Sequence, residues 1–358
     1  MAELDRAVVA AGHVSMAGRC FICSVYAVEP RGSTPKDAMV PMSDENRTQG
    51  SDATRLRRSC LAVPGSSERM LAKARGLSAD EVVLDLEDAV APSEKTDATR
   101  ELVVQALLDR AWLAPTLVVR INAVGTRWCL DDVTYVVSGA GSALHGFVLP
   151  KVESARQIHF VAQLLEQLEM KHELSRRIAL EIQIESPRGL LRLEELAEAS
   201  DRIEALIFGP GDYAAAAGAP QLTVGAPERD YPGDQWHYVL SRILTVARAF
   251  GLQAIDGPYA AIRDLDGFRT LAVGSRVLGF DGKWAIHPDQ IAVCNEVYTP
   301  TQEQLDQAIE LLASYERAAT GARSGATVFD GDMIDEASRK MAELTVRRAR
   351  AAGGRSSE

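Results

Sequence analysis

The strongest constraint on the fold is an alternation of short apolar runs with longer amphipathic stretches, which begins near Arg57. Strands that alternate with helices pair in parallel through right-handed crossovers. Eight such units in roughly 240 residues close a TIM (β/α)8 barrel, which we expect over residues 55–299. The apolar runs predict strands at residues 60–63, 82–86, 117–121, 146–149, 179–184, 205–208, 253–255 and 277–280. The amphipathic stretches predict helices that include residues 68–75, 94–108, 155–169, 190–199, 236–250 and 265–273.

An open doubly wound sheet is the alternative architecture for this alternation. It is disfavoured because no G-x-G-x-x-G motif follows the first predicted strand. Beyond the predicted barrel, helical stretches at residues 302–319 and 334–350 flank a connector rich in Gly, Ser and Ala. Such appendages often cover an active site, so we expect residues 300–358 to form a mobile C-terminal helical lid.

Residues 1–54 do not share this pattern. Residues 29–54 are rich in Pro, Gly, Ser, Thr, Asn and charged residues without periodicity, which predicts a disordered leader. Two alternatives stay open for this segment, a true start at Met42 and a signal peptide over residues 18–28.

The charge balance and the cysteines exclude several classes of protein. The formal net charge of −11 argues against non-specific binding to nucleic acid. No apolar run reaches the roughly 18 residues that a membrane span needs. Five cysteines are too few and too scattered for a disulfide framework, so we expect a reducing cytoplasm. The lone C-x-x-C at Cys20 and Cys23 is interpreted as two ordinary thiols.

Polar residues follow the predicted strands at the end where TIM barrels carry their catalytic groups. Any one of them could be a loop charge or a helix cap. Their recurrence after seven strands predicts an active site at this end of the barrel. These residues are Asp85, Glu87, Asp88, Arg120, Asn122, Lys151, Glu153, Glu185, Asp212, Asp256, Lys283 and His287.

Carboxylates dominate this set, and several unpaired carboxylates at one barrel mouth would repel one another. A hard divalent cation resolves the repulsion, and Mg²⁺ is typically held by one or two carboxylates, waters and substrate oxygens. The near absence of His and Cys argues against zinc. The planar fork of Arg120 suits a substrate carboxylate, although a structural salt bridge to Glu87 or Asp88 is the alternative.

The same positions carry a family resemblance. The segments concerned are RSCLAVPGSSERMLAKA, VVLDLEDAVAPSEKTDA, VVRIN, LPKVES, IQIESPRGL, FGPGDYAAAAG, GFDGKWAIHPDQI and GATVFDGDMIDEA. They resemble the citrate lyase β-subunit-like family of HpcH/HpaI aldolase-type CoA-ester lyases, which includes the malyl-CoA and β-methylmalyl-CoA lyases. The resemblance runs from about Arg57 to the last predicted helix, and residues 1–54 have no counterpart in it.

The resemblance implies a homotrimer or hexamer with one Mg²⁺, or alternatively Mn²⁺, in each site. Glu185 and Asp212 match the metal ligands of the family, and Arg120 matches the arginine that holds the carboxylate of the 2-keto acid. Asp335 matches a lid aspartate that enters a neighbouring subunit's site and moves protons. Ser67 departs from the arginine that some malyl-CoA lyases carry there. The other substrate-binding positions are Lys73 on the CoA side, Gly211, Ile286 and His287, and the supporting neighbours are Asp85, Glu87, Asp88 and Glu153.

The implied reaction is the reversible cleavage of a β-hydroxyacyl-CoA, such as L-malyl-CoA, β-methylmalyl-CoA or citramalyl-CoA. The products are a 2-keto acid, glyoxylate or pyruvate, and acetyl-CoA or propionyl-CoA. We expect Asp335 to act as the base, with Asp88 next in line. Lys151 as a Schiff-base lysine is a weaker alternative, because a metal already supplies the electron sink.

Three rival functions use the same fold. One is a malyl-CoA or citramalyl-CoA thioesterase, and another is a citrate lyase β subunit acting on a carrier-protein thioester. The third is an inactive binding protein, against which the intact Arg120, Glu185, Asp212 and Asp335 argue.

Overall fold

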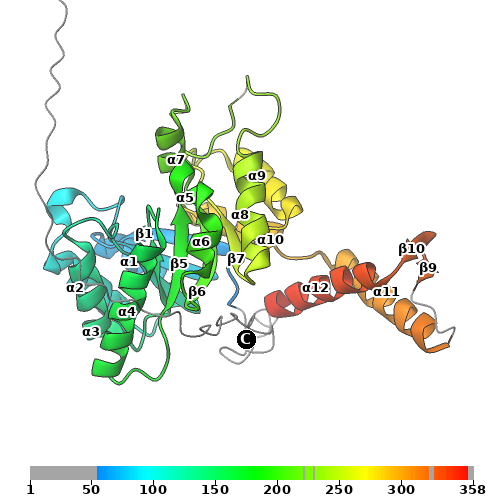
Figure 1. Cartoon of the computed structure of the whole chain (residues 1–358), viewed down its shortest axis with the longest axis horizontal. Helices are drawn as coiled ribbons and strands as arrows, with labels where there is room; N and C mark the ends of the chain where they lie inside the picture. Colours follow the sequence, from blue (N-terminus) through cyan, green and yellow to red (C-terminus); the bar gives the residue numbers. More distant parts are fainter. Residues whose placement is uncertain (1–54, 221, 229, 322–325, 354–358) are drawn as a thin grey trace, which may run out of the picture. The chain divides into compact units, whose positions relative to one another are not determined.

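The computed structural model describes residues 55–220, 222–228, 230–321 and 326–353. Eight of its strands form a closed parallel barrel in sequence order, in which β1 pairs with both β2 and β8 (Figure 1). The predicted TIM barrel is therefore confirmed, and the open doubly wound alternative is wrong. The strands are β1 (Ser59–Pro64), β2 (Glu81–Asp85), β3 (Thr116–Arg120), β4 (Gly146–Leu149), β5 (Ala179–Ile184), β6 (Ile203–Phe208), β7 (Gln253–Asp256) and β8 (Gly282–Ala285).

Helices follow the strands and cover their outer surface (Figure 1). Most predicted helices are present, whereas α3, α7 and α10 were not predicted. The helices of the barrel are α1 (Glu68–Ala74), α2 (Asp97–Leu108), α3 (Cys129–Ala140), α4 (Ala155–Lys171), α5 (Pro187–Leu191), α6 (Leu193–Glu198), α7 (Pro210–Ala217), α8 (His237–Ala249), α9 (Leu265–Leu278) and α10 (Pro288–Val297).

The eighth strand was predicted in the wrong place. The apolar run at residues 277–280 is the end of α9, and Val277 is largely exposed there. Gly279 ends this helix with a positive φ of 120°, a conformation that favours glycine. The true β8 comes a few residues later and contains Lys283, which made it inconspicuous as a strand.

Successive residues of each strand face opposite sides of the barrel wall, and this decides which polar groups reach the interior. Alternate apolar residues such as Val83, Val118 and Ile207 form a cluster inside the barrel. Their neighbours Leu84, Val119 and Phe208 belong to the larger core between the strands and the helices. By this alternation Asp85, at the end of β2, faces the interior.

A buried charge network closes the interior near the start of the strands. Arg57, only 2% exposed, donates from Nε to Glu81 at 2.8 Å and to Glu181 at 2.9 Å. Its other nitrogens contact Glu204 at 2.7 Å and Gln253. Burial raises the pKa of Glu181 well above its usual range, Arg57 opposes this effect, and Glu81 adds to it. Arg57 thus supplies the positive charge that stabilises the fully buried carboxyl groups of Glu81 and Glu181.

Replacing Arg57 by Leu is expected to lower the free energy of unfolding by about 3–5 kcal/mol, because it leaves buried carboxylates without a partner. Equilibrium urea unfolding measures the effect. Arg177→Leu is the matched control, since the Arg177–Asp201 ion pair is mostly exposed and should cost less than about 1 kcal/mol. Equal losses in the two variants would show that the buried network contributes no special stability.

The C-terminal segment forms a helical hairpin. It consists of α11 (Gln302–Gly321), the antiparallel strands β9 (Thr327–Phe329) and β10 (Asp332–Ile334), and α12 (Glu336–Gly353). The two helices share a small apolar cluster that includes Ala308, Ala342 and Val346. Arg348 of α12 also contacts Asp281, just before β8, at 2.9 Å. The predicted C-terminal helices are therefore confirmed, whereas their action as a lid is a separate proposal.

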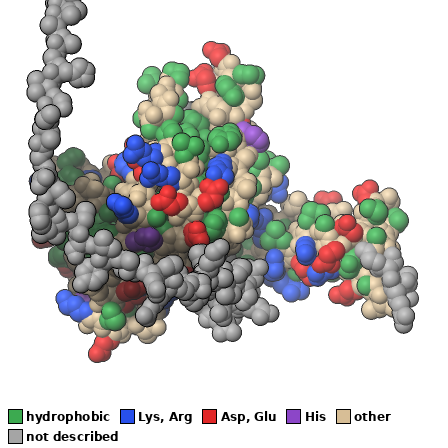
Figure 2. Space-filling model, viewed as in Figure 1, with side chains coloured by type: hydrophobic (Ala, Val, Ile, Leu, Met, Phe, Trp, Pro, Cys, Tyr) green, Lys and Arg blue, Asp and Glu red, His purple; other side chains and the backbone are tan. Residues whose placement is uncertain are grey.

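The predicted leader and the C-x-x-C motif lie outside the described residues. Within the described part of the chain, Cys60, Cys129 and Cys294 are free thiols, and all three are buried. No helix in this part is long and apolar enough to cross a membrane. On the face shown in Figure 2, acidic and basic side chains lie close to one another on the surface. Surface ion pairs such as Arg242–Glu194, at 2.6 Å, arise from this mixture.

Candidate active site

A cavity of about 440 Å³ opens at the carboxyl ends of the strands, where the predicted active site was placed. Residues from β1, β2, β3, β5 and β8, and from the segments that follow β6 and β7, line it. Pockets that combine apolar walls with a few convergent polar groups are typical binding sites. The lining residues are Ala62, Pro64, Asp85, Asp88, Ala89, Arg120, Gln183, Glu185, Gly209, Pro210, Gly211, Asp212, Val224, Pro258, Trp284 and Ile286.

Arg120 is held rigidly in this cavity by a carboxylate on the neighbouring strand. The register of β2 and β3 pairs Asp85 directly with Arg120, and the guanidinium binds that carboxylate in a bidentate manner, with Nε at 2.8 Å. Nη1 lies 3.4 Å from Glu87, and the guanidinium lies over the Trp284 ring at 5.2 Å. Burial lowers the pKa of Arg120, but Asp85, Glu87 and Glu185 together raise it above its usual value, so this residue stays a cation. The salt-bridge alternative is therefore right for Glu87, which pairs with Nη1, whereas the main partner of Arg120 is Asp85.

Lys151 places a second cation among the carboxylates. Its Nζ contacts Glu87, lies 3.0 Å from Asp88 and lies 3.3 Å from Asp212. Its backbone has a positive φ of 53°, which is uncommon for a residue with a side chain and typical of functional loops. Burial lowers the pKa of Lys151, but the contacts with Glu87 and Asp88 together raise it above its usual value, so the amine stays charged. A charged amine is a poor nucleophile, which argues against the Schiff-base alternative.

Glu185 follows β5 and is only 4% exposed. Its Oε2 accepts a hydrogen bond of 2.7 Å from the backbone N–H of Lys151. Burial raises its pKa to about 8, with Arg120 opposing this effect and the charges of Glu87 and Asp212 adding to it. Asp212 lies in the first turn of α7 and is partly exposed. Arg120 and Lys151 thus only partly offset the burial of Glu185.

The surplus of negative charge fits a divalent cation. The five carboxylates Asp85, Glu87, Asp88, Glu185 and Asp212 surround two cations, Arg120 and Lys151, which leaves a formal excess of three negative charges. No group of three or more His, Cys, Asp or Glu side chains arranged to hold a metal was found in the described residues. Two carboxylates with waters and substrate oxygens are, however, the usual protein environment of Mg²⁺. Glu185 and Asp212 suit this role, because neither forms a bidentate contact with an arginine.

Gly209 controls the position of Glu185. A Cβ atom at residue 209 would lie 2.3 Å from Cγ of Glu185 and 2.6 Å from its Oε1. Gly209→Ala is therefore expected to displace the carboxylate and weaken Mg²⁺ binding roughly 10- to 100-fold. Calorimetric titration with Mg²⁺ tests this, and Gly274→Ala is the control, because a Cβ there meets no atom within 4 Å. Unchanged Mg²⁺ affinity in the Gly209 variant would remove Glu185 from the metal site.

Several predicted residues lie outside the cavity. Asp256 and Lys283 face the helices and form a buried ion pair of 2.6 Å. Asn122 is held by Leu86, Asp132 and Lys95. Glu153 accepts a hydrogen bond of 2.7 Å from Ser186, the residue that caps α5 and directly follows Glu185. Asp256, Lys283 and Asn122 therefore stabilise the barrel wall. Glu153 supports the turn after β5.

The remaining substrate-binding candidates are also dispersed. Gly211 and Ile286 line the cavity. His287 directly follows Ile286 in the sequence and caps α10. Lys73 is exposed in the last turn of α1, which the structure does not bring to the cavity. Asp335 caps α12 by accepting hydrogen bonds from the backbone of Ala337 and Ser338. Within one chain, the structure thus brings the predicted metal and keto-acid residues into one cavity but does not bring Asp335 to them.

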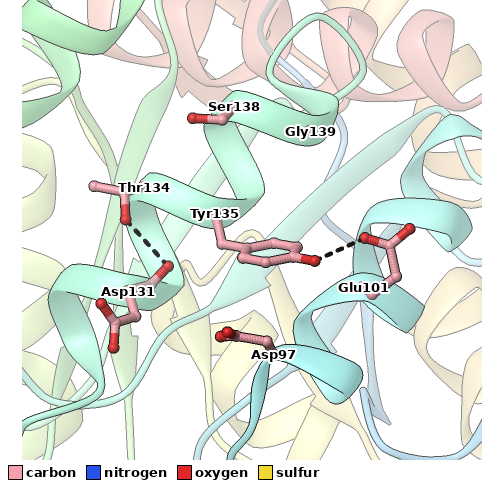
Figure 3. Close-up of a pocket in the computed structure, with 7 residues that line it drawn as sticks. All are labelled: Asp97, Glu101, Asp131, Thr134, Tyr135, Ser138 and Gly139. Carbon is pink, nitrogen blue, oxygen red and sulfur yellow. Dashed lines mark hydrogen bonds between the residues drawn. The ribbon is translucent and has the colours of Figure 1, made fainter.

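A second, larger hollow of about 580 Å³ lies between α2 and α3 on the outside of the barrel (Figure 3). Its side chains include Asp97, Glu101 and Asp131, and Tyr135 donates a hydrogen bond of 2.9 Å to Glu101. The lining contains no Lys or Arg, so it does not suit an anionic substrate. The cavity at the barrel mouth is therefore the better candidate active site.

The cavity residues that were not singled out from the sequence include Gln183, Gly209 and Trp284. For Gln183 a pattern was available. The sequence EIQIE places Glu181, Gln183 and Glu185 on the inner side of β5, where most other strands carry apolar residues. Gly209 and Trp284 gave no comparable pattern, because their roles depend on contacts between distant strands.

Comparison with known proteins shows which sequences share this arrangement. The family described as HpcH/HpaI aldolase/citrate lyase matches residues 58–288. The chain is 37% identical to the L-malyl-CoA/beta-methylmalyl-CoA lyase of Rhodobacter capsulatus over 313 residues, 85% of this chain and 98% of the relative. It is also 35% identical to a (3S)-malyl-CoA thioesterase of Cereibacter sphaeroides, over 82% of this chain and 95% of that protein.

Solved structures give the same picture. A crystal structure of protein CitE from Mycobacterium tuberculosis, in complex with magnesium, acetoacetate and coenzyme A, matches with a TM-score of 0.66 and 31% identity. The match covers 83% of this chain and 99% of that one.

Proposed function

Because this chain belongs to the HpcH/HpaI aldolase/citrate lyase family, we propose that it is a Mg²⁺-dependent carbon–carbon lyase acting on a β-hydroxyacyl-CoA. Its substrates are L-malyl-CoA, β-methylmalyl-CoA or citramalyl-CoA. Cleavage yields glyoxylate or pyruvate together with acetyl-CoA or propionyl-CoA.

One observation carries the proposal. A single cavity contains an arginine held by Asp85, beside two acidic residues, Glu185 and Asp212, neither of which forms a bidentate contact with an arginine. Arg120 suits the carboxylate of a 2-keto acid, and Glu185 and Asp212 suit the metal. When bound, the metal would polarise the carbonyl of the keto acid as a Lewis acid.

The protein supplies orientation and proton transfer. Asp85 fixes the fork of Arg120, so a keto-acid carboxylate bound to the guanidinium would be held in one orientation. In the condensation direction, a base takes the α-proton of acetyl-CoA, and the electrons of that C–H bond form the new bond to C2. The π electrons of the C2 carbonyl move to its oxygen, which takes up a proton and becomes the β-hydroxyl. In cleavage, the β-hydroxyl loses its proton and the C–C electrons return to the thioester fragment, which is then protonated at carbon.

Asp335 is the proposed base, delivered by the C-terminal hairpin of a neighbouring subunit in a trimer or hexamer. Two features support this arrangement. The hairpin helices pack on each other through their own apolar cluster, and Val328 and Met333 of the hairpin strands are largely exposed. Asp88, which lines the cavity, is the alternative base within the same chain. Partial burial raises its pKa, but hydrogen bonds with Glu87 and Lys151 lower it overall, so it is ionised at neutral pH.

Two finer points belong to the same proposal. The oxygen ligands that suit Mg²⁺ also accept Mn²⁺, so activity with Mn²⁺ is expected. The free thiols of Cys60, Cys129 and Cys294 agree with a reducing cytoplasm as the location.

A thioesterase is the second candidate, favoured by the 35% identity with the malyl-CoA thioesterase. The same cavity could direct water at the thioester carbonyl and release free CoA. The two reactions differ in the bond that breaks, so their products distinguish them.

The condensation direction provides the test. Purified full-length protein is incubated with acetyl-CoA, glyoxylate and Mg²⁺, and products are identified by mass spectrometry. We expect one product whose mass is the sum of both substrates, formed with Mg²⁺ or Mn²⁺ and lost with excess EDTA. If no product forms with glyoxylate or pyruvate, with either acetyl-CoA or propionyl-CoA, the lyase proposal is wrong.

A further inference from the structure

The inner side of β5 carries a polar residue that neither the ion pairs nor the metal site uses. Gln183 is 2% exposed and lines the cavity, two residues before Glu185 on the same side of the strand. Side chains at this spacing lie about 7 Å apart along a strand. Gln183 therefore forms part of the cavity floor, one layer deeper in the barrel than the proposed metal ligand.

The carboxamide of Gln183 has no partner of its own. Among the described residues, its buried Oε1 has no hydrogen-bond partner, and no hydrogen bond from its amide nitrogen is present. The nearly buried Trp284, which also lines the cavity and lies beneath Arg120, has an unpaired indole N–H as well. Among the described residues, the carboxamide N–H of Gln183 and the indole N–H of Trp284 therefore have no protein acceptor. Because buried donors are almost always paired, these two N–H groups at one cavity point to a ligand that offers acceptor oxygens.

We propose that Gln183 is a positioning residue for the 2-keto acid, and that its carboxamide N–H donates a hydrogen bond to the substrate carboxylate. This inference rests on the proposed function, which supplies the substrate class. The deep end of the cavity suits the small keto acid, because the nucleotide part of CoA is too large to enter the barrel. A 2-keto acid offers only acceptor oxygens, so the carboxamide can meet it only as a donor. Gln183 then adds a donor to the cavity that Arg120 also lines.

Calorimetric titration of glyoxylate into the Mg²⁺-loaded full-length protein tests the contact. Gln183→Met keeps the size of the side chain and removes the donor. We expect glyoxylate to bind roughly 10- to 100-fold more weakly to this variant, as for a lost hydrogen bond to a charged group. In the condensation assay the KM for glyoxylate should rise by a similar factor, while the KM for acetyl-CoA changes by less than about threefold.

Thermal unfolding without substrate provides the second measurement. Removing an unpaired buried amide should leave the Tm of Gln183→Met unchanged or raise it. Gln290→Met is the matched control, because Gln290 is fully buried but donates to Tyr259 and accepts from Ile286 and His287. That variant should lose several degrees of Tm.

The outcomes separate the two proposals. If the wild-type protein with Mg²⁺ binds no glyoxylate, the proposed function fails, and the role of Gln183 fails with it. If the wild type binds glyoxylate and Gln183→Met binds it equally well, the role of Gln183 alone is wrong. A loss of Tm in Gln183→Met as large as in the Gln290 control would also overturn it, because the carboxamide would then be structural.

Discussion

Glu185→Gln is expected to reduce the rate of malyl-CoA cleavage by about 1,000-fold or more, because it removes a charged ligand of the proposed metal. The substitution keeps the size of a side chain that is 4% exposed, and the backbone N–H of Lys151 can still bond to the remaining oxygen. Activity and Mg²⁺ affinity should therefore fall together while the barrel stays folded. The measurements are steady-state kinetics over a range of Mg²⁺ concentrations, and circular dichroism for the fold. An unchanged dependence on Mg²⁺ would place the metal elsewhere.

The raised pKa of Glu185 adds a dependence on pH. Since burial raises this pKa to about 8, a proton competes with Mg²⁺ below that pH, and Mg²⁺ affinity should increase up to about pH 8. In metal-free protein, the protonated carboxyl contributes stability below its unfolded pKa of about 4.3, and this contribution is lost as the pH rises through about 8. Saturating Mg²⁺ should weaken this loss. Glu185→Gln should abolish both dependences, which titration of Mg²⁺ at several pH values would reveal.

Asp335→Ala is expected to abolish turnover while leaving the binding of Mg²⁺ and glyoxylate intact. The residue caps α12 and makes no contact with the cavity within the described chain, so its removal should spare the barrel. We expect a loss of roughly 100- to 10,000-fold in kcat, the usual contribution of general acid–base catalysis. Retained activity would place the base within the same barrel, with Asp88 as the next candidate.

Mixing two inactive variants tests the exchange of the hairpin between subunits. Glu185→Gln subunits supply an intact Asp335, and Asp335→Ala subunits supply an intact metal site. If the hairpin acts on a neighbour, co-refolded or co-expressed mixtures should recover a substantial fraction of activity. A mixture as inactive as its parents would mean that each hairpin serves its own barrel.

Much of the barrel could be predicted from the sequence, because its strands are short apolar runs with clear ends. The ranges of β4 and β5 were predicted correctly to the residue. The wrong position of β8 shows the limit of this approach. An apolar run can end a helix as well as form a strand. The positive φ of Gly279, which ends the helix here, is visible only in the structure. The helix α10 was missed although Pro288 stands at its first position, a recognised helix start.

The candidate site shows a similar division. The barrel topology predicted that polar residues gather at the strand ends. Glu185, Asp212 and Arg120 do line one cavity there. The partner of Arg120 could not be deduced, because it depends on the register that sets Asp85 opposite it. Asp256 and Lys283 were expected at the mouth, but the alternation of β7 and β8 turns them toward the helices. Strand register and facing, which the sequence leaves ambiguous, therefore decide which polar residues share a site.

The most direct test of the lyase assignment is the fate of the two bonds of L-malyl-CoA. Purified protein with Mg²⁺ is mixed with L-malyl-CoA, released glyoxylate is trapped with phenylhydrazine, and free thiol is measured in the same sample. We expect Mg²⁺-dependent release of glyoxylate without free thiol, because the C–C bond breaks and the thioester survives. Free thiol without glyoxylate would contradict the lyase assignment and identify a thioesterase.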